Sequence, residues 1–151
     1  MIDSRKRFAR AVIAMLALLC VGVAIASAAR ALYVHDEGRL HYINSSGSLI
    51  REEGAATGTL AGRLQVHFLY DGSPTVTASF TISGNGWSLD GRGTGRLNNP
   101  NSPSPSFRGA MSITGGSGRY AHAHGSGEMF GVFYRRGHYA LTVQTLGELH
   151  Y

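Results

Sequence analysis

The 151-residue sequence predicts an all-β fold: an eight-stranded antiparallel β-barrel preceded by an N-terminal signal-peptide helix. Three observations predict it. Beyond residue 28, apolar and polar side chains alternate with period two, as they do on strands that have one buried face. Turn residues interrupt the alternation at short intervals, so neighbouring strands are expected to run antiparallel. Glycines such as Gly91, Gly93 and Gly95 lie within the predicted strands, where a strongly coiled barrel needs residues without a side chain.

The N-terminus has the layout of a secretory signal peptide. Basic residues precede an apolar run from Ala11 to Ala26, and Ala26-Ser27-Ala28 fits the small-residue rule of signal peptidase. We therefore expect cleavage after Ala28, a secreted or periplasmic protein, and a single barrel domain over residues 29–151. The alternative is an uncleaved membrane anchor, because the run approaches the roughly 20 residues that span a bilayer. In the cleaved form, only the signal peptide meets the membrane.

Removal of the signal peptide changes the charge of the chain. It takes away four of the 14 basic residues but only one of the nine acidic residues, so the formal net charge falls from +5 to +2. This balance gives no reason to expect nucleic-acid binding. The single cysteine, Cys20, leaves as well, so no disulfide is expected in the exported domain.

The strands follow one another between clusters of glycine, proline, asparagine, aspartate and serine. About eight strands are predicted, near 31–35, 39–43, 48–52, 57–70, 75–83, 86–97, 106–114 and 118–134, with 138–151 closing the chain. The clearest alternation sets Leu64, Val66 and Phe68 against polar neighbours. A sheet of this kind is expected to close into a barrel or fold into a sandwich, because long open edges invite aggregation.

The interior of such a barrel is either a packed core or a site for one small ligand. Large apolar side chains are candidates to line or fill it: Phe68, Phe80, Trp87, Phe107, Phe133 and Tyr139. On one predicted strand, the inward positions are occupied only by small residues: Ala121, Ala123, Gly125 and Gly127. This row either leaves space in the lumen or lets bulky residues of other strands fill it, and both interpretations stay open.

The segment Gly115–Gly125, "GGSGRYAHAHG", resembles the fingerprint G-G-T-G-x-[F/Y]-x-x-[A/S]-x-G of dirigent proteins and allene oxide cyclase barrels. The chain departs from it at Ser117. The matching residues are Gly115, Gly116, Gly118, Tyr120, Ala123 and Gly125. The resemblance covers roughly residues 57–151 and implies an eight-stranded antiparallel barrel that is often a homo-oligomer. In some members of this superfamily, the lumen guides a cyclisation or a radical coupling.

The resemblance does not assign catalytic residues, and the acidic residues offer no clear candidate. Several are interpreted as turn residues or as a solvated strand end: Asp36, Glu37 and Asp71, and the pair Glu52-Glu53. Within strands we place only Asp90, Glu128 and Glu148. A catalytic carboxylate needs burial to tune its pKa, and the sequence identifies no buried acid.

A second pattern overlaps the fingerprint. Gly116, His122-x-His124 and Glu128 match the first half of the cupin metal motif, G-x5-H-x-H-x3-E. Two imidazoles and a carboxylate would suit iron, manganese or zinc. However, the next motif glycine is replaced by Arg135, the second half of the motif has no counterpart, and glycines before Glu128 permit a bulge. We therefore expect these side chains on the polar outer face and predict no metal or cofactor, with the metal site as the alternative.

These observations favour an exported, non-enzymatic barrel that binds a small apolar ligand or has a structural role in the envelope. The alternative is a cyclase or isomerase that acts on a small hydrophobic substrate in the lumen. A cavity with a buried ionisable group would favour chemistry, whereas an apolar or filled interior would favour binding or scaffolding. The stretch "NNPNSPSPS", residues 98–106, is expected to be a surface loop, with a lid over the barrel mouth as the alternative.

Overall fold

The structure, a computed structural model, describes residues 30–134 and 140–151. The expected signal-peptide helix and its cleavage site lie outside these residues, as does Tyr139. Within the described ranges, no helix has the length and hydrophobicity that are needed to span a membrane.

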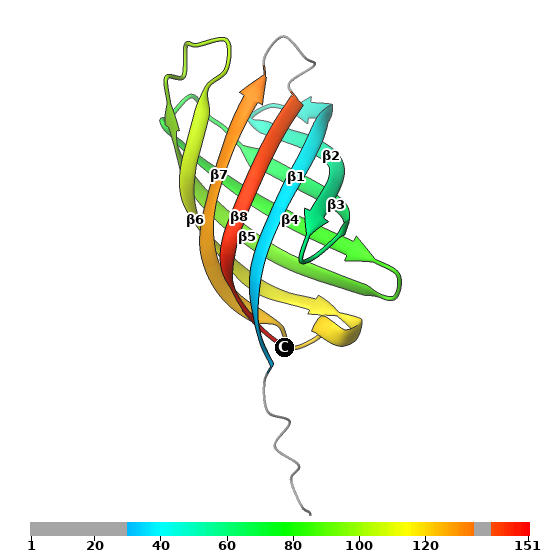
Figure 1. Ribbon diagram of the computed structural model, residues 1–151. Coiled ribbons are helices and arrows are strands. Elements are labelled where there is room, and N and C mark those ends of the chain that lie inside the picture. Colours follow the sequence, from blue (N-terminus) through cyan, green and yellow to red (C-terminus); the bar gives the residue numbers. More distant parts are fainter. Residues whose placement is uncertain (1–29, 135–139) are drawn as a thin grey trace, which may run out of the picture.

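Eight strands form one closed antiparallel barrel in chain order (Figure 1). They are β1 (Ala31–Ser46), β2 (Leu49–Gly58), β3 (Gly62–Leu69), β4 (Thr75–Gly84), β5 (Trp87–Asn98), β6 (Ser106–Ser117), β7 (His124–Tyr134) and β8 (Ala140–His150). Each strand pairs with the next one, and β8 closes the barrel by pairing with β1. The prediction of an all-β, eight-stranded antiparallel barrel is confirmed.

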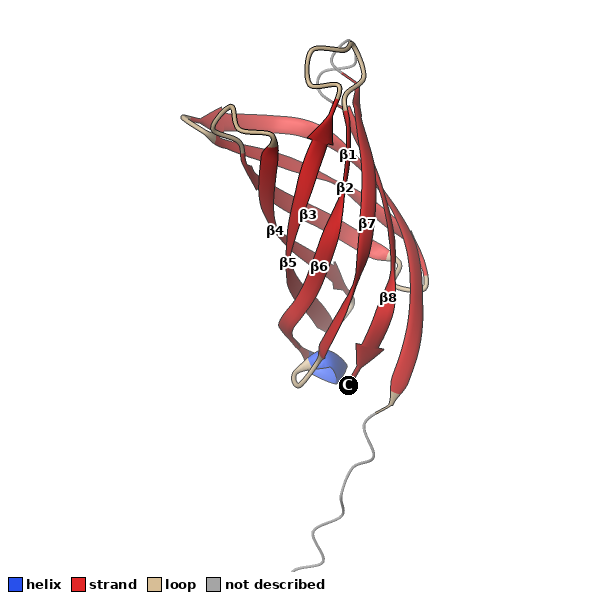
Figure 2. Ribbon diagram, turned by 90° about the vertical axis from the view of Figure 1, so that its left-hand side faces the viewer, coloured by secondary structure: helices blue, strands red, loops and turns tan. Residues whose placement is uncertain are grey.

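The two ends of the barrel differ. We call the end that carries the start of β1, the C-terminus and the short 3-10 helix η1 (Gly118–Tyr120) the lower end (Figures 1 and 2). Here Arg30 and Tyr151 exchange two backbone hydrogen bonds of 3.0 and 3.1 Å, which tie the described chain ends together. The β5–β6 loop, residues 99–105, lies at the opposite, upper end (Figure 1).

The predicted turn at Asp36-Glu37-Gly38 is wrong, because β1 continues through it. A Cβ on Gly38 would lie 2.5 Å from Cδ2 of Leu64, so this glycine makes room for an interior leucine and does not turn the chain. Asp36 accepts a hydrogen bond from the backbone N–H of Leu60. Residue types that usually signal a turn therefore serve packing inside a long strand.

Two other predicted strand boundaries also differ. The segment 57–70 is divided, because β2 runs to Gly58 and β3 begins at Gly62. The segment 118–134 forms a strand only from His124 onward, because η1 precedes it and Gly118 has a left-handed backbone with φ of 61°. A side chain at this φ would be strained.

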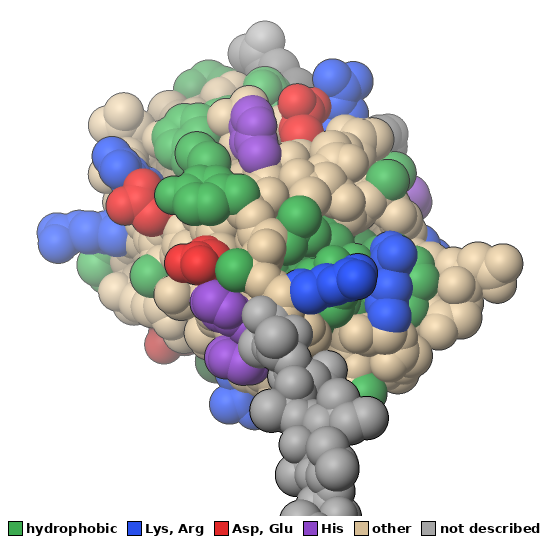
Figure 3. Space-filling view, turned by 60° about the horizontal axis from the view of Figure 1, so that its bottom comes forward, with side chains coloured by type: hydrophobic (Ala, Val, Ile, Leu, Met, Phe, Trp, Pro, Cys, Tyr) green, Lys and Arg blue, Asp and Glu red, His purple; other side chains and the backbone are tan. Residues whose placement is uncertain are grey.

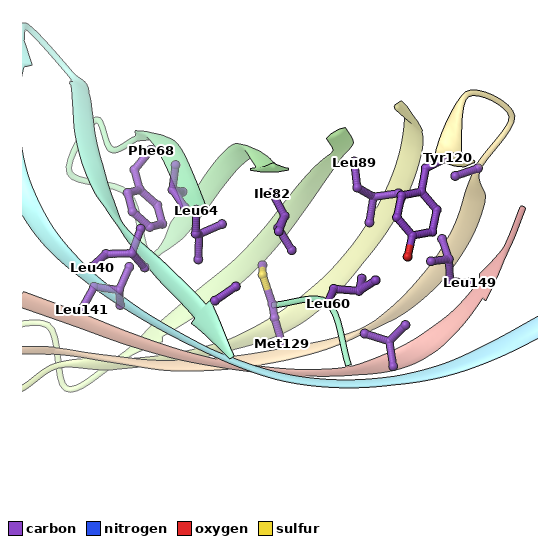
Figure 4. Close-up of a cluster of buried hydrophobic side chains, with 14 of the residues drawn as sticks. Leu40, Leu60, Leu64, Phe68, Ile82, Leu89, Tyr120, Met129, Leu141 and Leu149 are labelled. Carbon is purple, nitrogen blue, oxygen red and sulfur yellow. The ribbon is translucent and has the colours of Figure 1, made fainter. Parts of the chain in front are cut away.

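The inward faces of the strands supply one hydrophobic core. Leu89, Leu141 and Leu149 are almost completely buried. The buried side chains of the cluster point toward one another from strands all around the barrel: Leu60, Leu89, Tyr120 and Leu149 gather at one end of the cluster, and Leu40, Leu64, Phe68 and Leu141 at the other (Figure 4). The alternation predicted for β3 is confirmed, since Leu64, Val66 and Phe68 are buried between more exposed neighbours.

Candidate functional site

The barrel interior contains a cavity of about 70 Å3, here called the central cavity. All eight strands and Leu60 of the β2–β3 loop contribute to its wall. Its apolar side chains are Val34, Ala56, Leu60, Leu64, Val66, Phe68, Ala78, Phe80, Ile82, Leu89, Phe107, Met111, Ile113, Met129, Val143 and Leu149. An enclosed water needs roughly 10–15 Å3, so the central cavity has room for a small molecule.

Two acidic residues line this mainly apolar cavity, Asp36 and Glu148, and of these the Glu148 side chain is 54% exposed whereas Asp36 is buried. Asp36 is only 5% exposed, and its Oδ1 accepts a 2.8 Å hydrogen bond from the backbone N–H of Leu60. Its buried Oδ2 has no hydrogen-bond partner among the described residues. Burial raises the pKa of Asp36, although hydrogen bonds from the backbone of Leu60 and Thr59 and the nearby His35 act in the opposite direction. The central cavity therefore offers a bound molecule a free carboxyl oxygen.

A second acid, Glu52, is buried in the interior. It is 1% exposed and shares the inner face of β2 with Ile50 and Ala56. Burial raises the pKa of Glu52 to about 8, so the carboxyl group keeps its proton at neutral pH. Its Oε2 has no hydrogen-bond partner within the described part of the chain. On β3 its paired residue is Val66, which lines the central cavity.

The interpretations of Asp36 as a turn residue and of Glu52 as part of a solvated strand end are wrong. Glu53 does face outward, where its carboxylate binds Arg51 and Arg63. One signal could have found the buried acids: in each strand the acid is in phase with the apolar residues. Asp36 lies two residues after Val34, on the same inward face of β1. Glu52 likewise lies on the inward face of β2, four residues before Ala56.

The predicted lumen residues divide between different parts of the interior. Phe68, Phe80 and Phe107 line the central cavity. Phe133 lines a second cavity near the upper end. Trp87 lies at the lower end, where its ring packs edge-on against Tyr120 with centroids 5.1 Å apart.

Tyr120 is the centre of a plug that closes the lower end. It is 2% exposed, and its ring also packs edge-on against Tyr151 at 4.9 Å. The guanidinium of Arg119 lies over the rings of Trp87 and Tyr120, 5.3 and 4.8 Å from their centroids. The space-filling view of this end shows basic side chains against hydrophobic ones (Figure 3). The Tyr120 hydroxyl points inward between Leu60 and Leu149 (Figure 4).

The fingerprint residues surround this plug. Gly115 and Gly116 lie near the end of β6, and Gly118 begins η1. Ala123 is buried directly before β7, and Gly125 is the second residue of that strand. In this chain, the fingerprint therefore builds the connection that carries Tyr120 into the lower end of the barrel.

The three candidate metal ligands are not brought together. His122 lies in the turn before β7, whereas His124 begins the strand and stacks on His150 with ring centroids 5.3 Å apart. Glu128 forms a 2.9 Å ion pair with Arg108 on the outer face. In the described residues, no group of three or more histidine, cysteine, aspartate or glutamate side chains could hold a metal ion.

A second cavity, of about 120 Å3, lies near the upper end and is here called the upper cavity. Its wall consists of Ile50, Phe68, Tyr70, Val76, Leu97, Pro100, Pro105 and Phe133. Both prolines belong to the β5–β6 loop, residues 99–105. The predicted surface loop therefore covers part of the barrel interior. The N–H of Phe133 donates a 2.9 Å hydrogen bond to the carbonyl of Pro105 at the end of this loop, and the N–H of Ser102 donates one of 2.9 Å to Asn99 within it.

Comparison of the chain with protein families, with curated proteins and with solved structures found no match. The similarity to allene oxide cyclase and dirigent barrels stays a prediction.

Proposed function

We propose that the protein is an exported barrel that binds a small, mainly apolar molecule with one polar group in the central cavity. The observation that carries the proposal is the free Oδ2 of the buried Asp36 in a mainly apolar wall, to which Ser126, Thr145 and Glu148 also contribute. Burial of apolar ligand surface contributes roughly 25 cal/mol per Å2, which supplies affinity. Asp36 supplies selectivity, because a ligand without a hydrogen-bonding group leaves this buried oxygen unsatisfied. The export part of the proposal rests on the signal-peptide pattern of residues 1–28.

Two molecules of similar shape test this proposal: cyclohexanol, which carries a hydroxyl group, and methylcyclohexane, which does not. Calorimetric titration should show tighter binding of cyclohexanol to the unaltered protein. Asp36→Leu should remove the preference, whereas Asp36→Asn, which keeps a polar side chain of the same shape, should retain most of it. Val143→Phe should fill the central cavity and abolish binding of both molecules. Binding that survives Val143→Phe, or no binding of either molecule, would contradict the proposal.

The second candidate function is that of a cyclase or isomerase working in the same cavity. The raised pKa of Asp36 favours it, because a carboxyl group that titrates closer to neutrality exchanges protons with a bound molecule more readily. Cyclohexanone in D2O provides the test, since a general base at Asp36 would speed exchange of its α-protons. Exchange that is faster than with Asp36→Asn supports proton-transfer chemistry. Equal exchange with both proteins leaves binding as the function.

A further inference from the structure

Aromatic rings separate the upper cavity from the central cavity. Phe68 lines both cavities. Its ring packs edge-on against Phe133 of the upper cavity with centroids 5.6 Å apart. Phe133 in turn lies 5.5 Å from the ring of Phe107, which lines the central cavity. The interior is thus divided into two compartments by a partition of three rings.

The wall of the upper cavity suits a flat apolar ring. Pro100 and Pro105 close it from the loop, and Ile50, Val76 and Leu97 close it from the strands. The loop is held by the hydrogen bond from Phe133 to Pro105 and by the one from Ser102 to Asn99 within it, so this wall is part of the folded barrel. Aromatic rings pack favourably against aromatic edges, which the partition provides.

A polar group lies below the upper cavity. Glu52 follows Ile50 by two residues on the inner face of β2, a step of about 7 Å along a strand. It is 1% exposed, and its Oε2 has no partner among the described residues. Glu52 is not itself part of the upper-cavity wall, so a molecule seated against Ile50 and Phe68 meets it by extending one polar group along the inner face of β2.

We propose that the upper cavity is a second binding site, which takes an aromatic ring carrying one hydroxyl group, with Glu52 as the hydrogen-bonding partner of that hydroxyl. Apart from Phe68, which lines both cavities, the site differs from the central one in its wall residues, in its acid and in its occupant. Binding there does not require a ligand in the central cavity.

p-Cresol and toluene, which differ by one hydroxyl group, are the probes. Methyl NMR separates the compartments, since methyl groups of Val76 and Leu97 report on the upper cavity and those of Ile82 and Leu89 on the central one. p-Cresol should shift the upper methyl signals and bind there about 3- to 10-fold more tightly than toluene, the gain expected from one hydrogen bond. Glu52→Leu should remove this preference, and Glu52→Gln, which still donates and accepts, should keep it.

Val76→Phe should fill the upper cavity and abolish the upper shifts, and Leu97→Phe is the second filling variant should the first fail to fold. Upper methyl signals that neither probe moves, or shifts that persist in the filled variants, would overturn the proposal. An unchanged preference in Glu52→Leu would overturn the role of Glu52. The central methyl signals report separately on the central cavity, so failure of either site is recognised independently.

Discussion

The two faces of β2 place consecutive glutamates in opposite environments. Glu52 faces the interior, where burial raises its pKa to about 8. Glu53 faces outward, where hydrogen bonds from Arg63 and Arg51 lower its pKa to about 2. One step along a strand of a closed barrel therefore changes a carboxyl group from a buried neutral acid to the centre of a surface ion-pair cluster. The face of the strand, and not the residue type, decides the chemistry.

The largest effect is expected from Glu52→Gln. Between pH 4.5 and about 8, the unfolded chain has lost the Glu52 proton while the folded protein keeps it, so stability falls as the pH rises through this window. The loss amounts to as much as about 5 kcal/mol. Glu52→Gln should remove most of this dependence in urea unfolding at about pH 5 and about pH 9. Asp36→Asn is measured in parallel. The raised pKa of Asp36 also makes stability fall as the pH rises, and this variant separates that share from the share of Glu52. An unchanged pH dependence in Glu52→Gln would show that Glu52 is not buried.

The same contrast between faces applies to apolar residues. Leu89 is 0% exposed, whereas Leu69 is 51% exposed. Leu89→Ala should reduce the free energy of unfolding by about 2–5 kcal/mol, because it removes buried contacts and leaves a cavity. Leu69→Ala should change it by less than about 0.5 kcal/mol. Urea unfolding of both variants measures the difference, and similar losses would contradict the inward and outward assignment.

A smaller effect is expected from Asp36→Ala, which leaves the Leu60 N–H without its acceptor. The cost of an unsatisfied buried donor is about 1–3 kcal/mol. Asp36→Asn should cost less, because the amide oxygen still accepts this hydrogen bond. Thermal unfolding at neutral pH tests the order, and equal stability of the two variants would argue against the hydrogen bond.

The smallest effect is expected from Glu53→Gln on the outer face. The lowered pKa of Glu53 contributes stability that is present above pH 4.5 and lost as the pH falls toward about 2. Glu53→Gln should flatten the acid side of the stability profile and leave the window above pH 5 unchanged. Salt should weaken the contribution in the parent protein, because the arginine side chains that pair with Glu53 are partly exposed and ion pairs that solvent reaches are screened. A changed pH dependence above pH 5, as opposed to a constant loss of stability there, would indicate that Glu53 is not confined to the surface cluster.

The sequence predicted the barrel because apolar residues mark the inner face directly. Leu64, Val66 and Phe68 could be assigned to the interior from their spacing alone. Asp36 and Glu52 were missed because acids are usually exposed, and residue type was given more weight than phase. Gly38 strengthened the error, since a glycine after two acids resembles a turn until the interior leucine beside it is seen.

The cavities could not be predicted from the sequence. A cavity is the space left by side chains of all the strands, and its position depends on the register between them. Phe80, Phe107 and Phe133 all satisfy the same periodic pattern, yet Phe80 and Phe107 line the central cavity and Phe133 lines the upper one. The cover over the upper cavity depends on backbone hydrogen bonds such as that from Phe133 to Pro105, which composition does not reveal.

NMR titration of the carboxyl carbons of Glu52 and Glu53 tests most directly whether neighbouring positions face a buried interior and a charged surface. We expect the Glu52 signal to titrate at about 8 and the Glu53 signal at about 2. A Glu52 midpoint near its ordinary value of 4.5 would mean that water reaches this carboxyl group, and would contradict the assignment of a buried acid between the two cavities.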